Sequence, residues 1–148
     1  IDLPPGTGDI QLSLCQTIPL TGAVIVSTPQ DLALKVASKA IAMFKKLNTP
    51  ILGLVENMSF YLCSHCGKRD DIFGHGGTQN ASQELKLPFL GEIPLSTEIR
   101  RNSDDGYPTA LTENPYSTAF QSIANSVASQ ISITNYRASN IPSIEISN

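Results

Sequence analysis

The sequence predicts an α/β protein with a mostly parallel sheet and flanking helices. Three apolar runs, 22–26, 51–55 and 88–93, lack the alternation of polar and apolar residues that a half-exposed strand would show. Stretches with helical periodicity lie between these runs, and the connections are rich in Gly, Pro, Asp and Asn. Strands that alternate with helices in this way are typical of a parallel sheet covered on both faces.

The chain opens on a shaped loop. Ile1–Leu3 resemble the end of a buried strand, so we expect this chain to be the C-terminal part of a longer protein. In 2–9, two prolines disfavour a helix and two glycines permit unusual backbone angles. A strand ending in Asp before a glycine loop often presents a carboxylate to magnesium and amides to phosphate; a plain strand-to-helix turn has the same pattern.

The next two elements are a short helix and a strand. A helix is predicted over 9–17, with Ile10, Leu14 and Cys15 facing inward. The run 22–26 follows, and its β-branched, continuously apolar character indicates a strand covered on both faces.

A longer amphipathic helix comes next. Thr28 is a suitable N-cap, Pro29 fits the first turn, and the apolar periodicity continues to about Leu47. Its lysines fall on the opposite face and are expected in water. The predicted buried stripe consists of Ala33, Val36, Ala37, Ala40, Phe44 and Leu47.

The second strand, 51–55, is expected to end before the polar segment 56–59. That segment would then lie at the carboxyl edge of the sheet, where ligands bind in open α/β folds. A helix is predicted over 78–86, and the third strand, 88–93, is closed by Pro94.

The C-terminal region is predicted to be helical and then irregular. Ser96 is expected to cap a short helix through Arg100, and Pro115 to open a last helix. We assign 1–131 to a single domain and 132–148 to an irregular tail rich in Ser, Asn and Pro. The apolar face of the last helix consists of Phe120, Ile123, Ala124, Val127 and Ile131.

The composition excludes several classes of protein. A chain of 148 residues with 41% hydrophobic and 16% charged residues is ordinary for one globular domain. A net charge of -3 and a pI near 5.2 argue against a nucleic-acid partner. No apolar run reaches the length of a membrane span, so we expect no membrane partner, and no signal-peptide pattern opens the chain. Three cysteines suit a reducing compartment.

The pair Cys63 and Cys66 is the main candidate for chemistry. A C-x-x-C turn can direct two sulfurs at one metal, and Gly67 relieves crowding behind the second thiol. The same spacing also occurs in redox pairs, disulfides and solvated thiols. His65 and His75 are interpreted as solvated loop histidines. A zinc or cubane site needs about four ligands, so any metal site here would take its missing ligands from a second copy of the chain.

Taken together and in order, eight segments resemble the C-terminal two-thirds of an Mrp/ApbC-type iron–sulfur cluster carrier. These carriers are deviant P-loop ATPases of the MinD and nitrogenase-iron-protein (SIMIBI) group. The resemblance covers residues 1–131. The segments are Asp2–Asp9, Val26–Asp31, Val55–Ser59, Cys63–Gly67, Ile72–Gly74, Leu90–Leu95, Ile99–Arg100 and Asp105–Gly106.

The resemblance implies a homodimer that binds ATP and magnesium and carries a bridging 4Fe–4S cluster for transfer to apo iron–sulfur proteins. It implies a cytoplasmic protein or, alternatively, one of the mitochondrial matrix. Cys63 and Cys66 would be the cluster ligands. At the nucleotide site, the resemblance implies that the Asp2 carboxylate lies near magnesium and the attacking water, and that the Gly6 amide points toward the γ-phosphate. It also implies that Asn57 hydrogen-bonds to the adenine edge and that the loop at Pro94 borders the base.

The chain departs from that family in one respect. No G-K-[ST] occurs in it, so the N-terminal strand of the sheet and the phosphate loop of a P-loop ATPase are missing. We therefore predict that the intact protein is an ATPase, whereas these 148 residues alone neither bind ATP tightly nor hydrolyse it.

Two other functions remain open at this stage. A positioning ATPase of the MinD or ParA kind would be a dimerising switch without a metal, although the sequence has no lysine-rich amphipathic helix for a membrane. A dimer bridged by structural zinc would use the same thiolates at the same spacing.

Overall fold

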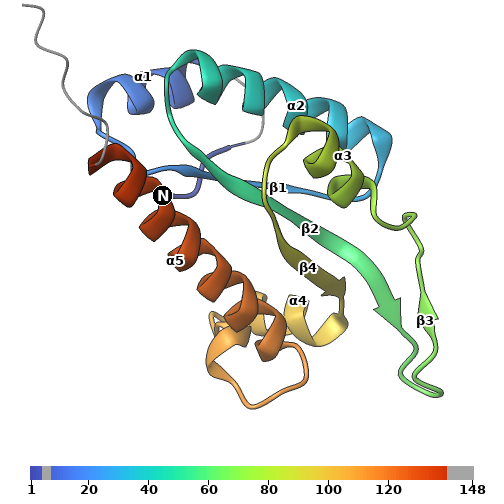
Figure 1. The fold of residues 1–148 in the computed structure, drawn as a ribbon. Helices are drawn as coiled ribbons and strands as arrows, with labels where there is room; N and C mark the ends of the chain where they lie inside the picture. Colours follow the sequence, from blue (N-terminus) through green and yellow to red (C-terminus); the bar gives the residue numbers. More distant parts are fainter. Residues whose placement is uncertain (5–7, 140–148) are drawn as a thin grey trace, which may run out of the picture.

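In a computed structural model, which describes residues 1–4 and 8–139, the chain forms the predicted α/β arrangement (Figure 1). A parallel sheet has β2 at its centre, with β1 and β4 on either side, and β3 pairs antiparallel with the end of β2. The strands are β1 (Ala23–Ser27), β2 (Ile51–Leu62), β3 (Arg69–Asp70) and β4 (Phe89–Leu95), and the helices are α1 (Asp9–Thr17), α2 (Asp31–Lys46), α3 (Gly77–Leu85), α4 (Thr97–Asp104), the short 3-10 turn Thr109–Leu111 and α5 (Ser117–Ser139).

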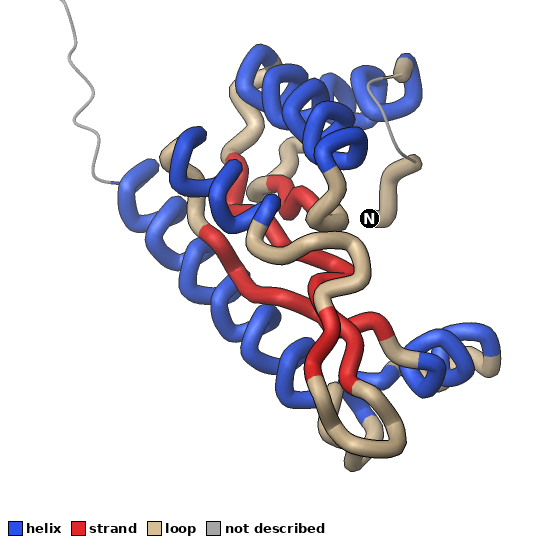
Figure 2. The backbone as a smooth tube through the Cα atoms, turned by 90° about the vertical axis from the view of Figure 1, so that its right-hand side faces the viewer, coloured by secondary structure: helices blue, strands red, loops and turns tan. Residues whose placement is uncertain are grey.

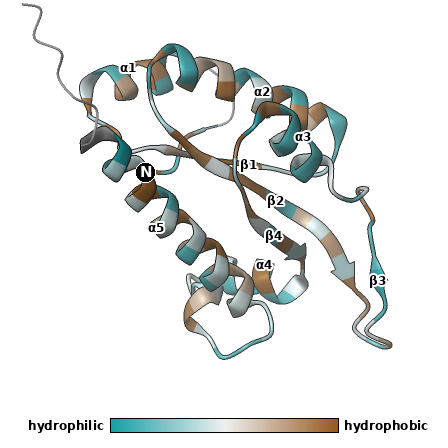
Figure 3. Cartoon of the chain, viewed as in Figure 1, coloured by the Kyte–Doolittle hydropathy of each residue, from teal (hydrophilic) through white to brown (hydrophobic). Residues whose placement is uncertain are grey.

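The helices form layers on the two faces of the sheet. Helices α1, α2 and α3 lie on one side and α5 on the other (Figure 1). Helix α2 contacts β1, α3 contacts β2, and α5 packs across β4 and β2. Hydrophobic residues are concentrated on the central strands, whereas β3 is hydrophilic (Figure 3). No helix in the described ranges is both long enough and apolar enough to cross a bilayer.

The main core lies between α2 and the first two strands. Ile25 of β1 and Leu54 of β2 face the same side and meet the buried stripe of α2. Ala37 and Phe44 are buried as predicted, but Ile41 and Met43 are buried as well, and Val36 is 40% exposed. The face that α2 presents to the sheet is therefore slightly rotated from the face that its apolar periodicity predicts.

The predictions for the helix ends and for the inward face of α1 hold only in part. Helix α1 has the predicted bounds, but Ile10 is 67% exposed, and Gln11 is buried instead because its amide donates to the carbonyl of Pro4. Thr28 does not cap α2; Gln30 occupies the N-cap position, and the Thr28 hydroxyl donates to the Gln30 side chain. Ser96 does cap α4, because its oxygen accepts from the amide of Glu98.

Strand β1 is covered on one face only. Val24 and Val26 are 37% and 58% exposed, which contradicts the predicted two-sided burial. These side chains lie on the α5 side of the sheet, and α5 packs over β4 and β2.

Two strands are longer than predicted. Strand β2 continues through 56–59 to Leu62, so the polar segment lies within the strand rather than in a loop after it. Strand β4 likewise continues past Pro94, which is buried within it and does not close it. The β2–β4 register breaks between Asn57 and Tyr61, and Met58 in this stretch has a φ of 53°. The break is a β-bulge that accommodates the extra residues of β2.

Helix α5 extends into the range predicted to be an irregular tail. It runs to Ser139, because no Pro or Gly interrupts 132–139 and half-buried Ile131 and Thr134 continue its apolar stripe. Residues 140–148, which complete the predicted tail, lie outside the described residues.

Candidate functional site: a cysteine hairpin and the ion-pair network at its base

Cys63 and Cys66 lie in the turn of a β-hairpin formed by β2 and β3. The hairpin extends past the helices, with the turn at its far end (Figures 1 and 2). The Cys63 amide donates to the carbonyl of Lys68 over 2.9 Å, and the Gly67 amide donates to the carbonyl of Cys63 over 2.8 Å. Gly67 has a φ of 68°, a left-handed conformation that favours glycine. This explains in backbone terms why a glycine follows the second thiol.

The turn is built to stabilise a thiolate. The backbone amides of Cys66 and His65 donate hydrogen bonds to the Cys63 sulfur, the Cys66 side chain contacts it, and together they lower the pKa of the Cys63 thiol. Since thiolates are the metal-binding form of cysteine, this arrangement favours ligation. Cys63 is half-buried and Cys66 is exposed, so both sulfurs are near the surface and close to one another.

The third cysteine and the two histidines are the other candidate ligands that the sequence offers. Cys15 packs against the main core from α1. His75 contacts Arg69, and His65 is exposed in the turn itself. The turn therefore presents two thiols at its tip, and its exposure leaves room for a second molecule to approach.

The residues predicted for the nucleotide site are only partly brought together. Asp2 and Asn57 line one cleft of about 540 Å³ between the start of the chain, β1 and α2. The Asn57 side chain accepts from the amide of Met58 over 2.9 Å. Pro94 lies within β4 and is not among the lining residues, and Gly6 lies outside the described residues.

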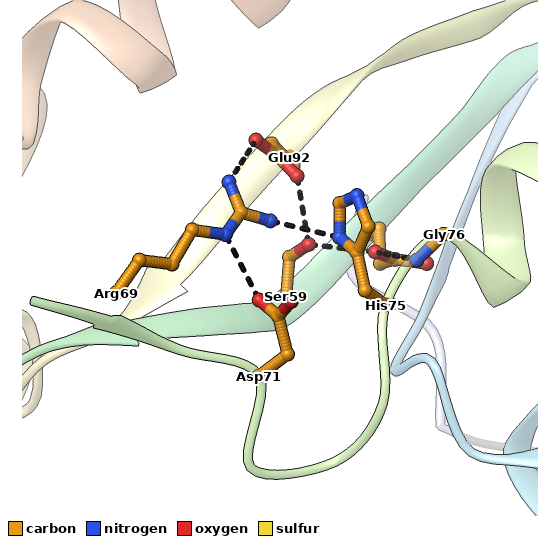
Figure 4. Close-up of polar contacts among 7 residues, drawn as sticks. Ser59, Arg69, Asp71, His75, Gly76 and Glu92 are labelled. Atoms are coloured by element: carbon orange, nitrogen blue, oxygen red, sulfur yellow. Dashed lines mark hydrogen bonds and ion pairs between the residues drawn. The ribbon is translucent and has the colours of Figure 1, made fainter.

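At the base of the hairpin lies a polar network that the sequence reasoning missed (Figure 4). Glu56 of β2 and Glu92 of β4 are register partners on neighbouring strands. Glu56 is 1% exposed, and its carboxylate accepts from the amides of Gly76 over 3.3 Å and Thr78 over 2.7 Å. It thereby accepts from the N-cap residue and from one amide of the first turn of α3, where Gly76 offers no side-chain cap.

A single hydroxyl links the two carboxylates. The Ser59 Oγ lies 2.6 Å from Glu56 Oε1 and 2.8 Å from Glu92 Oε2. Since a hydroxyl has one hydrogen, it can donate to only one carboxylate at a time. Like charges on paired strands repel, and a nearby cation offsets this repulsion.

Arg69 of β3 supplies that cation. Its guanidinium donates to Asp71 Oδ1 over 2.9 Å, to Glu92 Oε1 over 3.4 Å and to His75 Nδ1 over 2.8 Å (Figure 4). Its Cζ atom also lies 4.0 Å from the centre of the Phe60 ring. Arg69 thus connects the hairpin to β4 and to the loop before α3.

The same cluster has the ligand types of a metal site. Oxygen and nitrogen atoms of Glu56, His75 and Glu92 lie within 4.8 Å of one another. These groups already accept hydrogen bonds from Arg69 and from the α3 amides, so the cluster is satisfied as an ion-pair network. The sequence contains one signal for this network, because an acidic residue, Glu56, directly follows the apolar run 51–55. The pairing of Glu56 with Glu92 follows only from the strand register.

Comparisons with known proteins agree with this architecture. A family model described as "ParA: NUBPL iron-transfer P-loop NTPase" matches residues 1–128. The chain is 47% identical over 136 residues to the iron-sulfur cluster transfer protein NUBPL of Dictyostelium discoideum, covering 90% of this chain and 42% of that protein. It is 47% identical over 133 residues to the iron-sulfur cluster carrier protein of Escherichia coli (strain K12), covering 88% and 36%.

Among solved structures, the nucleotide-binding protein of Archaeoglobus fulgidus in complex with ADP is similar. It superposes with a TM-score of 0.64 at 45% identity, over 72% of this chain and 44% of that one. The chain thus spans less than half the length of these relatives. The match over residues 1–128 confirms both the predicted fold class and the predicted resemblance, and the chain belongs to the family of NUBPL iron-transfer P-loop NTPases.

Proposed function

We propose that the protein carries an iron–sulfur cluster between two copies of its chain and passes it to apo iron–sulfur proteins. The observation that carries the proposal is the hairpin turn, which presents two thiols at its exposed tip. Relatives named as cluster carrier and cluster transfer proteins support the same function. Two thiolates per chain supply half of the ligands of a 4Fe–4S cluster, so a two-fold symmetric dimer completes it.

The physical basis of loading and release is the position of the cluster at the tip. The amides of the turn lower the pKa of the Cys63 thiol, which favours its thiolate form, and Cys66 is open to solvent. A cluster shared by two such tips would lie at the dimer interface, where separation of the chains exposes it to a recipient protein. Transfer needs no covalent step on this chain beyond exchange of thiolate ligands.

The nucleotide part of the mechanism belongs to the intact protein. The described residues that line the cleft of Asp2 and Asn57 are mainly apolar and include no Lys or Arg. They do not fit the charge of ATP phosphates with magnesium, so we derive no step through ATP on these 148 residues. For the intact protein, we propose the Asp2 carboxylate near magnesium, the Gly6 amide toward the phosphate, and Asn57 and Pro94 near the base.

Anaerobic reconstitution with iron and sulfide tests the cluster site. We expect about one 4Fe–4S cluster per two chains in the unchanged protein, and loss of iron and sulfide in the Cys63→Ala/Cys66→Ala variant. Cys15→Ala is the matched control, since this third cysteine packs against the core from α1 and should leave the cluster intact.

The experiment also separates this function from the structural alternative. The same turn could hold zinc between two chains, because zinc uses thiolates at this spacing. Metal analysis of protein purified without oxygen that finds zinc and no sulfide would favour that alternative. Iron and sulfide retained in the double variant would contradict any role for these thiols.

A further inference from the structure

The hairpin that carries the thiols has little backbone support of its own. Strand β3 consists of two residues, Arg69 and Asp70, and within the described residues its pairing is limited to Tyr61 and Leu62 of β2. Both residues of β3 are exposed, and the strand is hydrophilic (Figure 3). A two-stranded ribbon is marginal in water without packing or side-chain contacts. Other contacts must therefore fix the direction in which the turn points.

Arg69 provides these contacts. It lies three residues after Cys66, and its guanidinium connects the hairpin to β4 through Glu92 and to the following loop through Asp71 and His75 (Figure 4). It also lies over the ring of Phe60 on β2. A guanidinium has several donors in a fixed plane, so it can hold three partners at once, which a lysine ammonium on a flexible stem does less well.

The anchor on the other side leads into the buried part of the sheet. Glu92 contacts Ser59, which is fully buried, and Ser59 contacts the buried Glu56. The Glu56 carboxylate in turn binds the first amides of α3. Arg69 is thus connected through Glu92 to two strands and a helix of the body.

We propose that Arg69 is the positioning residue of the cluster site: by binding Glu92, Asp71 and His75 it holds the Cys63–Cys66 turn in the orientation in which a second chain completes the ligand set. This proposal rests on the proposed cluster-carrying function. It assigns to the network at the hairpin base a role in cluster retention as well as in folding.

The test compares Arg69→Met with Arg101→Met. Methionine keeps an apolar stem against Phe60 but removes the charge and all donors, and Arg101 is an exposed arginine on α4 outside the network. The first measurement is hydrogen exchange of the peptide that spans 61–70 in protein without a cluster. We expect faster exchange there in Arg69→Met and no change in α2 or in the Arg101→Met control.

The second measurement is the rate at which reconstituted protein loses iron to a chelator. We expect Arg69→Met to form a cluster with an unchanged absorption spectrum but to lose it about three- to tenfold faster. Arg69→Lys should restore only part of the retention. Glu92→Gln should add little to Arg69→Met, because residues that act through one contact give non-additive effects.

The outcomes separate the two proposals. Unchanged exchange of 61–70 in Arg69→Met overturns the positioning role whether or not a cluster forms. Faster exchange with unchanged chelator loss also overturns it, because the hairpin would then be loosened without effect on the site. Faster exchange in a protein that binds no cluster in any form contradicts the proposed function, while the role of Arg69 in holding the hairpin stands.

Discussion

At the scale of single residues, the surroundings of the Cys63 sulfur determine the chemistry expected of the turn. Amides of Cys66 and His65 donate to it, and they stabilise the charged form more than the neutral one. The pKa of Cys63 is therefore lowered on folding. The thiolate is populated at a lower pH in the folded chain than in the unfolded one, and its extra stabilisation is lost as the pH falls through the lowered pKa.

This predicts a pH profile for modification of Cys63. Because alkylating agents react with the thiolate, the midpoint of the alkylation rate of Cys63 should lie at lower pH in folded protein than in protein unfolded in denaturant. Mass spectrometry of the peptide that contains Cys63 measures it. Cys66→Ala should move the midpoint part of the way back, since it removes the side-chain contact and leaves the amides. Equal midpoints in folded and unfolded protein would show that the turn does not activate the thiol.

At the scale of elements, the sequence was sufficient where the pattern is local. The apolar runs and helical periodicities predicted three parallel strands and the helices between them, and the C-x-x-C spacing with Gly67 predicted the turn. The length of β2 was not predictable, because polar residues in 56–59 are typical of a loop. Pairing with both neighbouring strands continues β2 into this segment: Glu56 is a register partner of Ser27 on β1 and of Glu92 on β4. The network was missed for the same reason: Glu56 and Glu92 meet through strand register, which no local pattern encodes.

The connection between β2 and α3 gives a stability prediction. Glu56→Gln replaces one acceptor oxygen by an NH₂ group facing the donors of Gly76, Thr78 or Ser59, so the free energy of unfolding should fall by about 1–3 kcal/mol. Urea denaturation measures this, with Glu98→Gln, an exposed residue in the first turn of α4, as the control. Equal effects of the two substitutions would mean that the buried carboxylate does not stabilise α3.

At the scale of the whole molecule, the chain covers less than half the length of its relatives. Its cleft at Asp2 and Asn57 is lined mainly by apolar side chains, and β1 exposes Val24 and Val26 on the face that α5 leaves open. The sequence contains no G-K-[ST] that would bind phosphates. Within the described residues, the two thiols are presented by a hairpin, whereas the cleft at Asp2 and Asn57 has no Lys or Arg among its lining residues.

We therefore predict that these 148 residues alone do not bind ATP tightly. Calorimetric titration with ATP and magnesium should give no saturable signal in the micromolar range, because the lining residues in the described ranges include no Lys or Arg side chain for the phosphates. The Archaeoglobus fulgidus protein, whose structure contains ADP, is a suitable positive control. Saturable binding of ordinary micromolar strength would refute the prediction.

The central claim is that each chain contributes two thiolates and a second chain completes the site. Native mass spectrometry of anaerobically reconstituted protein tests it most directly. The account predicts a species with the mass of two chains and one 4Fe–4S cluster, absent when Cys63 or Cys66 is replaced by alanine. A cluster carried by a single chain, or by a dimer of the variants, would contradict it.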